Sequence, residues 1–228
     1  RWVDPENILK LTLPTGAAYI ELNSALAPKH SANIKKLARQ GFYQGTHIYR
    51  FVEGFVAQGG DSTGKKLTKT KNSTVPSEFY LTTNKPLMIT EMGRDGYAPI
   101  TGFLNGFAVA QNETRDQTWQ IHCHGGFAMA RGNDINSAST EFFVTIGQGP
   151  RYLDKNITVF GRVLTGMAHF HQLARTPKGG SEFNPITDLQ VLADVSSDHS
   201  RFKVMKTDSD AFKQLLSARG SRSEEWFA

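Results

Sequence analysis

One arginine, Arg50, lies in the middle of a run of aromatic and aliphatic residues, 43–61 (YQGTHIYRFVEGFVAQGGD). A guanidinium is always charged and carries several hydrogen-bond donors in a fixed geometry. In an apolar, water-poor setting such a donor acts far more strongly on an acceptor than it does in water. The run fits equally well a half-buried arginine that pairs with a carboxylate such as Glu53. By itself it leaves a catalytic and a structural arginine open.

Two further runs contain strand patterns next to polar loops. Residues 126–145 (GFAMARGNDINSASTEFFVT) pass from small residues through a polar loop to an aromatic pair. Residues 151–167 (RYLDKNITVFGRVLTGM) contain a second strand pattern that ends at a glycine. Taken singly, each run is more typical of a core strand than of a site. Their order along the chain carries more information than either run alone.

In this order the three runs resemble the cyclophilins, a family of peptidyl-prolyl cis-trans isomerases. Residues 43–61 are similar to the family signature Y-x-G-x-x-F-H-R-x-x-x-G-F-x-x-Q-G-G-D. The second run is similar to its M-A-…-Q-F-F segment, and the third to its W-L-D-…-V-F-G-x-V-…-G-M segment. The resemblance covers roughly residues 8–173, with two long segments as insertions.

The resemblance implies a mainly β fold: a closed eight-stranded antiparallel barrel capped by two helices. It implies catalysis of rotation about X–Pro peptide bonds in protein substrates, without a cofactor or metal. The expected partners are proline-containing peptides or unfolded protein clients. The alternative is a proline-peptide binding module or chaperone with weak catalysis, because Val56, Glu141 and Ile157 change the groove.

The resemblance also assigns roles to individual residues. Arg50 matches the catalytic arginine, and Gln58 matches the glutamine that binds the substrate backbone and steadies that arginine. The other matched positions are the proline-pocket walls and the groove backbone: Phe55, Val56, Phe143 and Leu153 for the walls, and Ala130 and Arg131 for the groove.

Several positions depart from the family pattern. Tyr49 replaces a histidine, Val56 a methionine and Glu141 a glutamine, which brings a carboxylate into the groove. Ile157 stands where many members have an active-site histidine. Tyr152 replaces the tryptophan important for cyclosporin binding and lacks its indole N–H, so we expect weak cyclosporin binding.

Other patterns admit other chemistry. Residues 60–64 match G-x-S-x-G, the nucleophile turn of serine hydrolases, but KKLTKTKN at 65–72 has no apolar helical stripe to follow it. His122 with His124, and His169 with His171, are possible metal pairs that lack an acidic third ligand at useful spacing. The basic residues of 65–71 have no interleaved aromatics, which favours a solvated loop over a nucleic-acid site.

Composition and charge exclude several kinds of site and of cellular environment. The chain has 228 residues, a formal net charge of +5 and one cysteine, which excludes an intramolecular disulfide and a multi-cysteine zinc site. No apolar run approaches the roughly 20 residues that a membrane span needs, so we expect no membrane insertion. The resemblance is to the bacterial type, some members of which are exported. Together with the first residue not being Met, this predicts a periplasmic protein, with a cytoplasmic one as the alternative.

The elements that would hold these residues follow from hydrophobic periodicity. Alternation predicts a hairpin over 8–22, further strands at 47–52, 55–58, 126–130, 141–146 and 158–164, and a late strand at 188–195. Helical spacing predicts helices at 28–40, 167–173 and 209–218. Residues 62–76 and 91–119 show no clear pattern. We therefore predict an isomerase domain over 1–180 and an extension over 181–228 that packs on the barrel.

Overall fold

Alternating leucines build the first hairpin. In the computed structural model, which describes residues 1–64, 66, 74–175 and 183–220, β1 (Ile8–Leu13) pairs antiparallel with β2 (Gly16–Leu22). Leu9, Leu11 and Leu13 point to one face and are almost completely buried. The predicted hairpin is therefore confirmed, and its apolar face forms part of the core.

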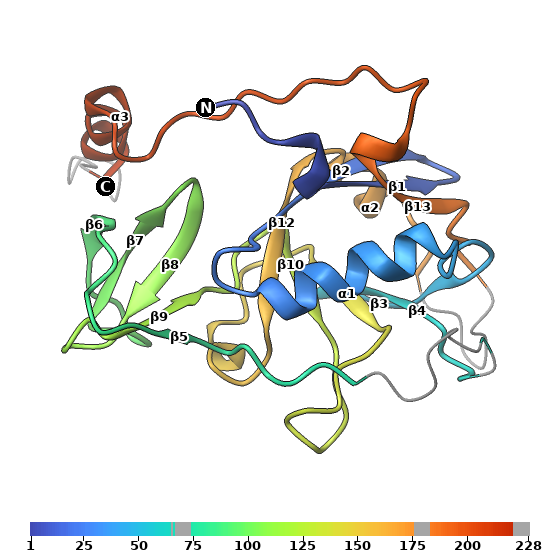
Figure 1. Ribbon diagram of the computed structural model, residues 1–228, viewed down its shortest axis with the longest axis horizontal. Helices are drawn as coiled ribbons and strands as arrows, with labels where there is room; N and C mark the ends of the chain where they lie inside the picture. Colours follow the sequence, from blue (N-terminus) through green and yellow to red (C-terminus); the bar gives the residue numbers. More distant parts are fainter. Residues whose placement is uncertain (65, 67–73, 176–182, 221–228) are drawn as a thin grey trace, which may run out of the picture.

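Eight strands form one antiparallel sheet, in the order β13-β1-β2-β12-β10-β11-β4-β3 (Figure 1). Sequence neighbours are often not sheet neighbours, so the core joins distant parts of the chain. The remaining strands of this sheet are β3 (His47–Val52), β4 (Val56–Gly60), β10 (Gly126–Met129), β11 (Phe142–Thr145), β12 (Val159–Thr165) and β13 (Asp188–Val191).

The eight-stranded sheet curls until its two ends meet. The segment before β13 hydrogen-bonds to β3, where the N–H of Ile48 donates to the carbonyl of Asn184 at 2.9 Å. A single bridge pairs His47 with Pro185. The predicted mainly β fold with eight strands is confirmed. The closure is looser than a closed barrel implies, because a short bridge takes the place of a full ladder.

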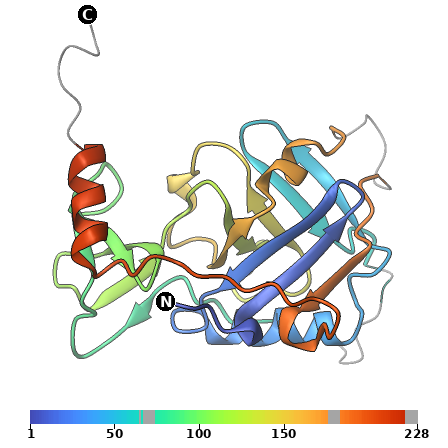
Figure 2. The same cartoon turned by 90° about the horizontal axis from the view of Figure 1, so that it is seen from above.

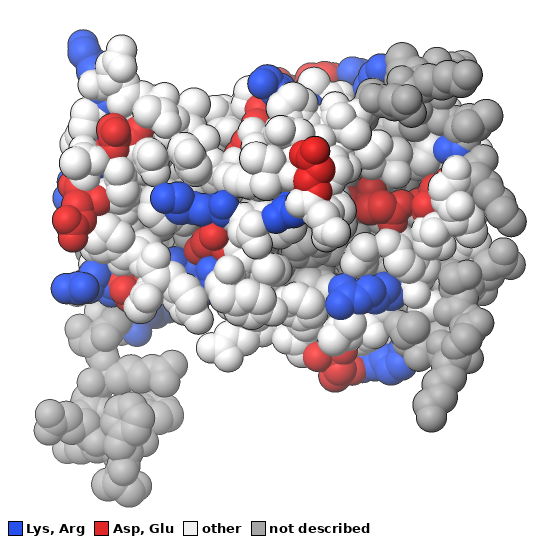
Figure 3. Space-filling view, turned by 90° about the horizontal axis from the view of Figure 1, so that it is seen from below, with Lys and Arg blue, Asp and Glu red and all other residues white. Residues whose placement is uncertain are grey.

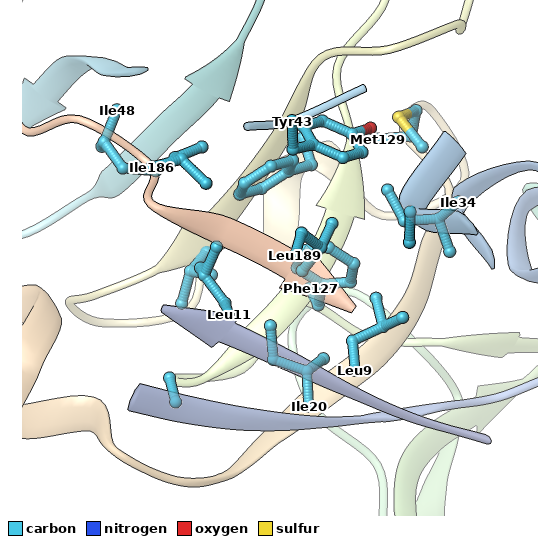
Figure 4. Close-up of a cluster of buried hydrophobic side chains, with 14 of the residues drawn as sticks. Leu9, Leu11, Ile20, Ile34, Tyr43, Ile48, Phe127, Met129, Ile186 and Leu189 are labelled. Atoms are coloured by element: carbon cyan, nitrogen blue, oxygen red, sulfur yellow. The ribbon is translucent and has the colours of Figure 1, made fainter. Parts of the chain in front are cut away.

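Side chains on the inner face of this sheet make the main core. Phe127 contacts the rings of Phe142 and Phe160, with centroids 5.2 and 4.8 Å away. The helix α1 (Pro28–Arg39) covers this core with Ile34 among its buried residues, as Figure 4 shows. A short helix, α2 (Met167–His171), buries Phe170 in the same cluster. Both predicted capping helices are present.

A second sheet occupies residues that we predicted to be patternless. Its five strands, in the order β5-β9-β8-β7-β6, lie at one end of the molecule (Figure 1). Residues 91–119, which showed no clear pattern in the sequence, therefore contain most of a sheet. The strands are β5 (Leu81–Thr82), β6 (Thr90–Gly93), β7 (Ile100–Leu104), β8 (Phe107–Gln111) and β9 (Gln117–Gln120).

The C-terminal segment contacts both sheets. Its strand β13 ends at Val191, earlier than predicted, and a 3-10 turn (Leu192–Asp194) follows. The helix α3 (Asp210–Gly220) lies beside the five-stranded sheet (Figure 2), with the rings of Phe212 and Phe103 5.1 Å apart. β13 follows residue 180 and is a member of the large sheet. The domain boundary placed at residue 180 stays a prediction.

Charge is dispersed over the surface. On the face drawn in Figure 3, basic and acidic residues lie among one another rather than in a single basic area. Among the predicted basic residues at 65–71 only Lys66 lies in the described part of the chain, and its Nζ is 5.6 Å from the ring centroid of Phe42. Within that part, no helix combines the length and hydrophobicity needed to cross a membrane.

Candidate active site

Strand register brings the predicted residues into one row. Arg50 on β3 is opposite Gln58 on β4, which is opposite Phe143 on β11. Phe143 in turn is opposite Ala128 on β10, and Ala128 is opposite Val159 on β12. Residues directly opposite one another on paired strands point to the same face of a sheet. Five strands therefore present one continuous row of side chains.

This row faces away from the main core. The sequence neighbours of its members, Ala57, Phe142 and Phe127, belong to the inner cluster. Since successive residues on a strand point to opposite faces, the row lies on the outer face of the sheet. Strand alternation thus supplies both the core that stabilises the fold and the surface that carries the site.

The apolar part of the row extends into a patch, which we call the outer apolar patch. Val56 and Phe143 are only 2% and 6% exposed, and Phe55 and Ile157 are half-buried against them. The patch consists of Phe55, Val56, Ala128, Ala130, Phe143, Ile157 and Val159. Five predicted site residues are among its members, whereas Ala128 and Val159 were not predicted.

Leu153, predicted as a pocket wall, lies in a turn before the outer apolar patch, and its role in the pocket stays a prediction. It lies half-buried in a 3-10 turn (Arg151–Leu153) and is not a member of the outer apolar patch. Its carbonyl accepts the N–H of Ile157 at 3.0 Å, so it supports the patch through the backbone. Tyr152, in the same turn, is 65% exposed.

Arg50 lies at the edge of the outer apolar patch. Its Cζ is 5.9 Å from the ring centroid of Phe55, and its Nη1 donates to Oε1 of Gln58 at 3.1 Å. Glu53, the carboxylate of the structural alternative, pairs instead with Arg175 at 2.6 Å. The guanidinium is therefore held by a neutral amide beside an apolar surface. The structural alternative, in which Arg50 pairs with the carboxylate of Glu53, is not supported.

Glu141 is held by hydrogen bonds from its neighbours. Its carboxylate is hydrogen-bonded to Tyr49, whose hydroxyl oxygen also accepts the Nε2–H of Gln58 at 2.6 Å. Burial raises the pKa of Glu141 above its usual range, and burial also raises the pKa of Tyr49. Glu141 thus contacts Gln58 through Tyr49, and its place in the groove stays a prediction.

Arg131 braces the groove with its side chain. Its Nε donates to the carbonyl of Asn156 at 3.0 Å and its Nη2 to the Oδ1 of the same residue at 2.6 Å. Ala130 donates its N–H to the carbonyl of Glu141 at 2.7 Å, which continues the pairing of β10 with β11. Ala130 belongs to the outer apolar patch and Arg131 follows it in the chain, and that their backbone lines the groove stays a prediction.

His122 supports Phe143 from behind, which the sequence analysis missed. The two rings stack at 6.1 Å with an interplanar angle of 11°. The backbone N–H of His122 donates to Asp154 Oδ1 at 2.9 Å, and its Nδ1 lies 2.8 Å from the same oxygen. Arg151 also donates to Asp154, at 2.6 Å. The separation of 32 residues between His122 and Asp154 gives no local sequence signal of this contact.

The other sequence candidates are placed as follows. Ser62 lies in a turn after β4. His124 and His171, one from each proposed metal pair, stack with ring centroids 5.7 Å apart. Among the residues that the structure describes, no three His, Cys, Asp or Glu side chains are grouped to hold a metal ion.

Comparison with known families decides the class. The sequence model of the family "Cyclophilin type peptidyl-prolyl cis-trans isomerase/CLD" matches residues 8–193. The chain belongs to the cyclophilins. It is thus a cyclophilin-type peptidyl-prolyl cis-trans isomerase, as the three sequence runs predict. The matched region contains both the row of site residues and the five-stranded sheet.

Relatives of this cyclophilin occur in bacteria and eukaryotes. A probable peptidyl-prolyl cis-trans isomerase of Brucella suis is 33% identical over 164 residues, which cover 72% of this chain and 69% of the relative. Peptidyl-prolyl cis-trans isomerase-like 1 of Mus musculus is 27% identical, covering 84% of this chain and 92% of the relative.

Solved structures agree with the fold. The crystal structure of cyclophilin AquaCyp293 from Hirschia baltica has a TM-score of 0.82 at 30% identity, covering 96% of this chain and 86% of that one. A Cryptosporidium parvum cyclophilin type isomerase, crystallised in the presence of the dipeptide Ala-Pro, has a TM-score of 0.55 at 20% identity. It covers 81% of this cyclophilin and 98% of its own chain, and supports the fold alone.

Proposed function

We propose that this cyclophilin accelerates rotation about X–Pro bonds through the electrostatic action of Arg50 beside the outer apolar patch. The uncatalysed rotation takes tens to hundreds of seconds, because it breaks the partial double bond of the amide. In the twisted transition state the proline nitrogen regains its lone pair and becomes a better hydrogen-bond acceptor. A fixed guanidinium beside that nitrogen binds the transition state more strongly than either planar isomer.

The observation that carries the proposal is the position of Arg50. Its guanidinium is held by Gln58 at 3.1 Å while its face lies near Phe55. In our proposal the patch holds the proline ring, and Val56 and Phe143 form its buried floor. Each tenfold gain in rate requires about 1.4 kcal/mol, so one charge-assisted hydrogen bond in an apolar setting accounts for about two orders of magnitude.

Replacing Arg50 with Ala tests this proposal. Removal of one such donor lowers kcat/KM by about 10²- to 10³-fold, with little change in unfolding free energy. The control is Arg175→Ala, since Arg175 also lies over a ring, with its Cζ 4.4 Å from the centroid of Phe51, but is paired with Glu53. We expect kcat/KM within about twofold of the wild type there, because a largely exposed ion pair contributes little.

Equal activity in Arg50→Ala and the wild type would contradict the assignment. Tight binding of a proline peptide by the wild type with negligible turnover would support the binding-module alternative instead. Proline-containing segments of unfolded proteins are the proposed substrates. Weak cyclosporin binding at the exposed Tyr152 and a periplasmic location stay predictions.

A further inference from the structure

A chain of hydrogen bonds leads from Arg50 to a half-buried carboxylate. Arg50 Nη1 donates to Gln58 Oε1 at 3.1 Å, and Gln58 Nε2 donates to the Tyr49 hydroxyl oxygen at 2.6 Å. The Tyr49 hydroxyl is hydrogen-bonded to Glu141. Two side chains thus connect Arg50 to a group that can change its charge.

Both ends of this chain impose the same direction on it. A carboxylate only accepts hydrogen bonds, so the Tyr49 O–H must donate to Glu141 and leave its lone pairs for the Nε2–H of Gln58. A guanidinium only donates, so it requires the Oε1 of Gln58. The ionised form of Glu141 therefore selects the amide orientation that Arg50 needs.

Glu141 occupies a site that is shaped for it. Gly60 has φ +136°, and a Cβ there would come within 2.6 Å of the Glu141 Oε1, so a larger residue would displace the carboxylate. The N–H of Asp61 also donates to Glu141. The Oε2 of Glu141 is buried without a hydrogen-bond partner among the described residues. Such a carboxylate is incompletely stabilised and gains from a proton.

The charged and titratable groups around Glu141 come from β3, from the segment before it and from the residue after β4. Burial is the main cause of its raised pKa, and the negative charge of Asp61 after β4 adds to it. The hydrogen bonds from Tyr49 and from the Asp61 N–H act in the opposite direction. The other groups that interact with this cluster are Arg50 on β3, whose charge acts on Tyr49, and the buried Tyr43, which is affected by Glu141.

Protonation of Glu141 removes the constraint on direction. A protonated carboxyl can donate to the Tyr49 oxygen, which allows the Tyr49 proton to turn toward Gln58. Gln58 then satisfies that donor only with its Oε1, and its amide Nε2 turns toward the guanidinium. Two donors would face each other, so the hold on Arg50 is lost in that arrangement.

We propose that Tyr49 and Glu141 are positioning residues that fix the amide of Gln58 and through it Arg50, and that protonation of Glu141 loosens this hold. The proposal rests on the role proposed above for Arg50. The expected direction of the pH dependence is that kcat/KM is highest where Glu141 is ionised and falls as pH decreases through the raised pKa of that residue.

The test measures kcat/KM on a proline tetrapeptide by NMR exchange between about pH 4 and pH 8, a range that begins near the ordinary glutamate value of about 4.3 and extends above it. No coupling protease is needed, so the pH profile belongs to the isomerase. We expect the wild type to lose activity toward the acidic end. Tyr49→Phe should lower kcat/KM on the order of fivefold at pH 8, the value of one hydrogen bond, and flatten the profile.

Glu141→Gln sharpens the test. It keeps the shape of Glu141 but can donate or accept, so we expect a flat profile and a loss of a few-fold at pH 8. Glu91→Gln is the matched control, since Glu91 pairs with Arg115 at 2.9 Å on the five-stranded sheet, and it should keep the wild-type profile. A wild-type profile in Glu141→Gln would overturn the proposal.

A second measurement does not depend on activity. The side-chain amide NMR signal of Gln58 should shift with pH in the wild type and stay constant in Glu141→Gln. If Arg50→Ala left turnover intact while this signal still titrated, the catalytic role of Arg50 would fail but the coupling would stand. If the Gln58 signal did not titrate in an otherwise active enzyme, the coupling would fail and Arg50 would keep its role.

Discussion

The two sheets differ in what their apolar side chains do. The eight-stranded sheet curls around its own core, in which Leu9, Ile20 and Phe127 are fully buried, and leaves its outer face for the site. The five-stranded sheet has only small buried clusters and leaves Met88 and Met92 exposed by 87% and 59%. The first sheet positions the site by its own packing, whereas the stability of the second sheet depends on the segments packed against it.

The second sheet contacts the site region through polar and cationic groups. Asp95 pairs with Arg151, whose Cζ also lies 5.5 Å from the ring centroid of Tyr97. Lys155 lies 5.0 Å from the ring centroid of Trp119 and 5.1 Å from that of Tyr80. These contacts reach the loop that leads to Ile157, not the outer apolar patch itself. We therefore predict that matched substitutions in the two sheets change the unfolding free energy and kcat/KM to different extents.

The largest difference should come from matched core substitutions. Phe127→Ala removes a fully buried ring from the large sheet and should cost about 3–5 kcal/mol of unfolding free energy. Phe107→Ala removes a ring that is 4% exposed from the small sheet, where one of its neighbours is the surface guanidinium of Arg162. We expect a smaller cost and preserved kcat/KM there, measured by urea unfolding and by isomerase assay. Equal losses would contradict the division between the sheets.

An intermediate effect should come from the two carboxylates that contact Arg151. Asp154→Ala leaves the buried N–H groups of His122 unpaired, which costs about 1–3 kcal/mol and loosens the stack on Phe143, so kcat/KM should also fall. Asp95→Ala breaks a more exposed ion pair and removes the acceptor of the Tyr97 and Ala98 N–H groups, so it should cost about 1 kcal/mol and leave kcat/KM near the wild-type value. Thermal unfolding with activity measurements compares the two. A larger activity loss in Asp95→Ala would show that the small sheet controls the site.

The smallest effect concerns the connection between the sheets, where Glu78 precedes β5. Burial alone would raise the pKa of Glu78, but hydrogen bonds from the His30 ring and from the N–H groups of Lys29 and His30 outweigh it and lower that pKa. A lowered folded-state pKa stabilises the protein above the unfolded value of about 4.3, and this is lost as pH falls through the folded value.

Glu78→Gln should therefore lower the unfolding free energy by about 1 kcal/mol at neutral pH. Its difference from the wild type should shrink as the pH falls below about 4, because the wild-type carboxylate is then also protonated. Denaturant unfolding at several pH values measures this. A difference that does not change with pH would assign the effect to packing rather than to charge.

Much of the large sheet and its site was accessible from the sequence. Alternation marked the strands, and the motif around Arg50 and Gln58 marked residues of the outer row. Val56 and Gln58 share a face because they are two apart on β4. The five-stranded sheet was missed because most of its strands are short and lack a strong alternation. One signal was available: Asn105-Gly106, with φ of 52° and 95°, joins β7 to β8 in the manner typical of tight hairpins.

Other parts of the site had no sequence signal. His122 and Asp154 meet because β10 pairs antiparallel with β11, so the segment before β10 lies beside the segment after β11, which leads to Asp154. Tyr49 and Glu141 were recognised as departures from the family pattern, but their contact depends on the register of three strands. The assignment of Leu153 to the pocket wall stays a prediction, because a motif fixes its position in the chain but not the direction of its side chain.

Pairing of β1 with β13 has a consequence for the making of this protein. During synthesis β1 leaves the ribosome long before its partner strand, so one edge of the growing sheet stays open to other chains until the end of the family region is made. The strands that carry Arg50 and Phe143 are complete by then, since β3 and β11 both precede β13 in the chain. The nascent cyclophilin thus holds all the strands of its groove before its cylinder closes, and its last-made strand protects the first.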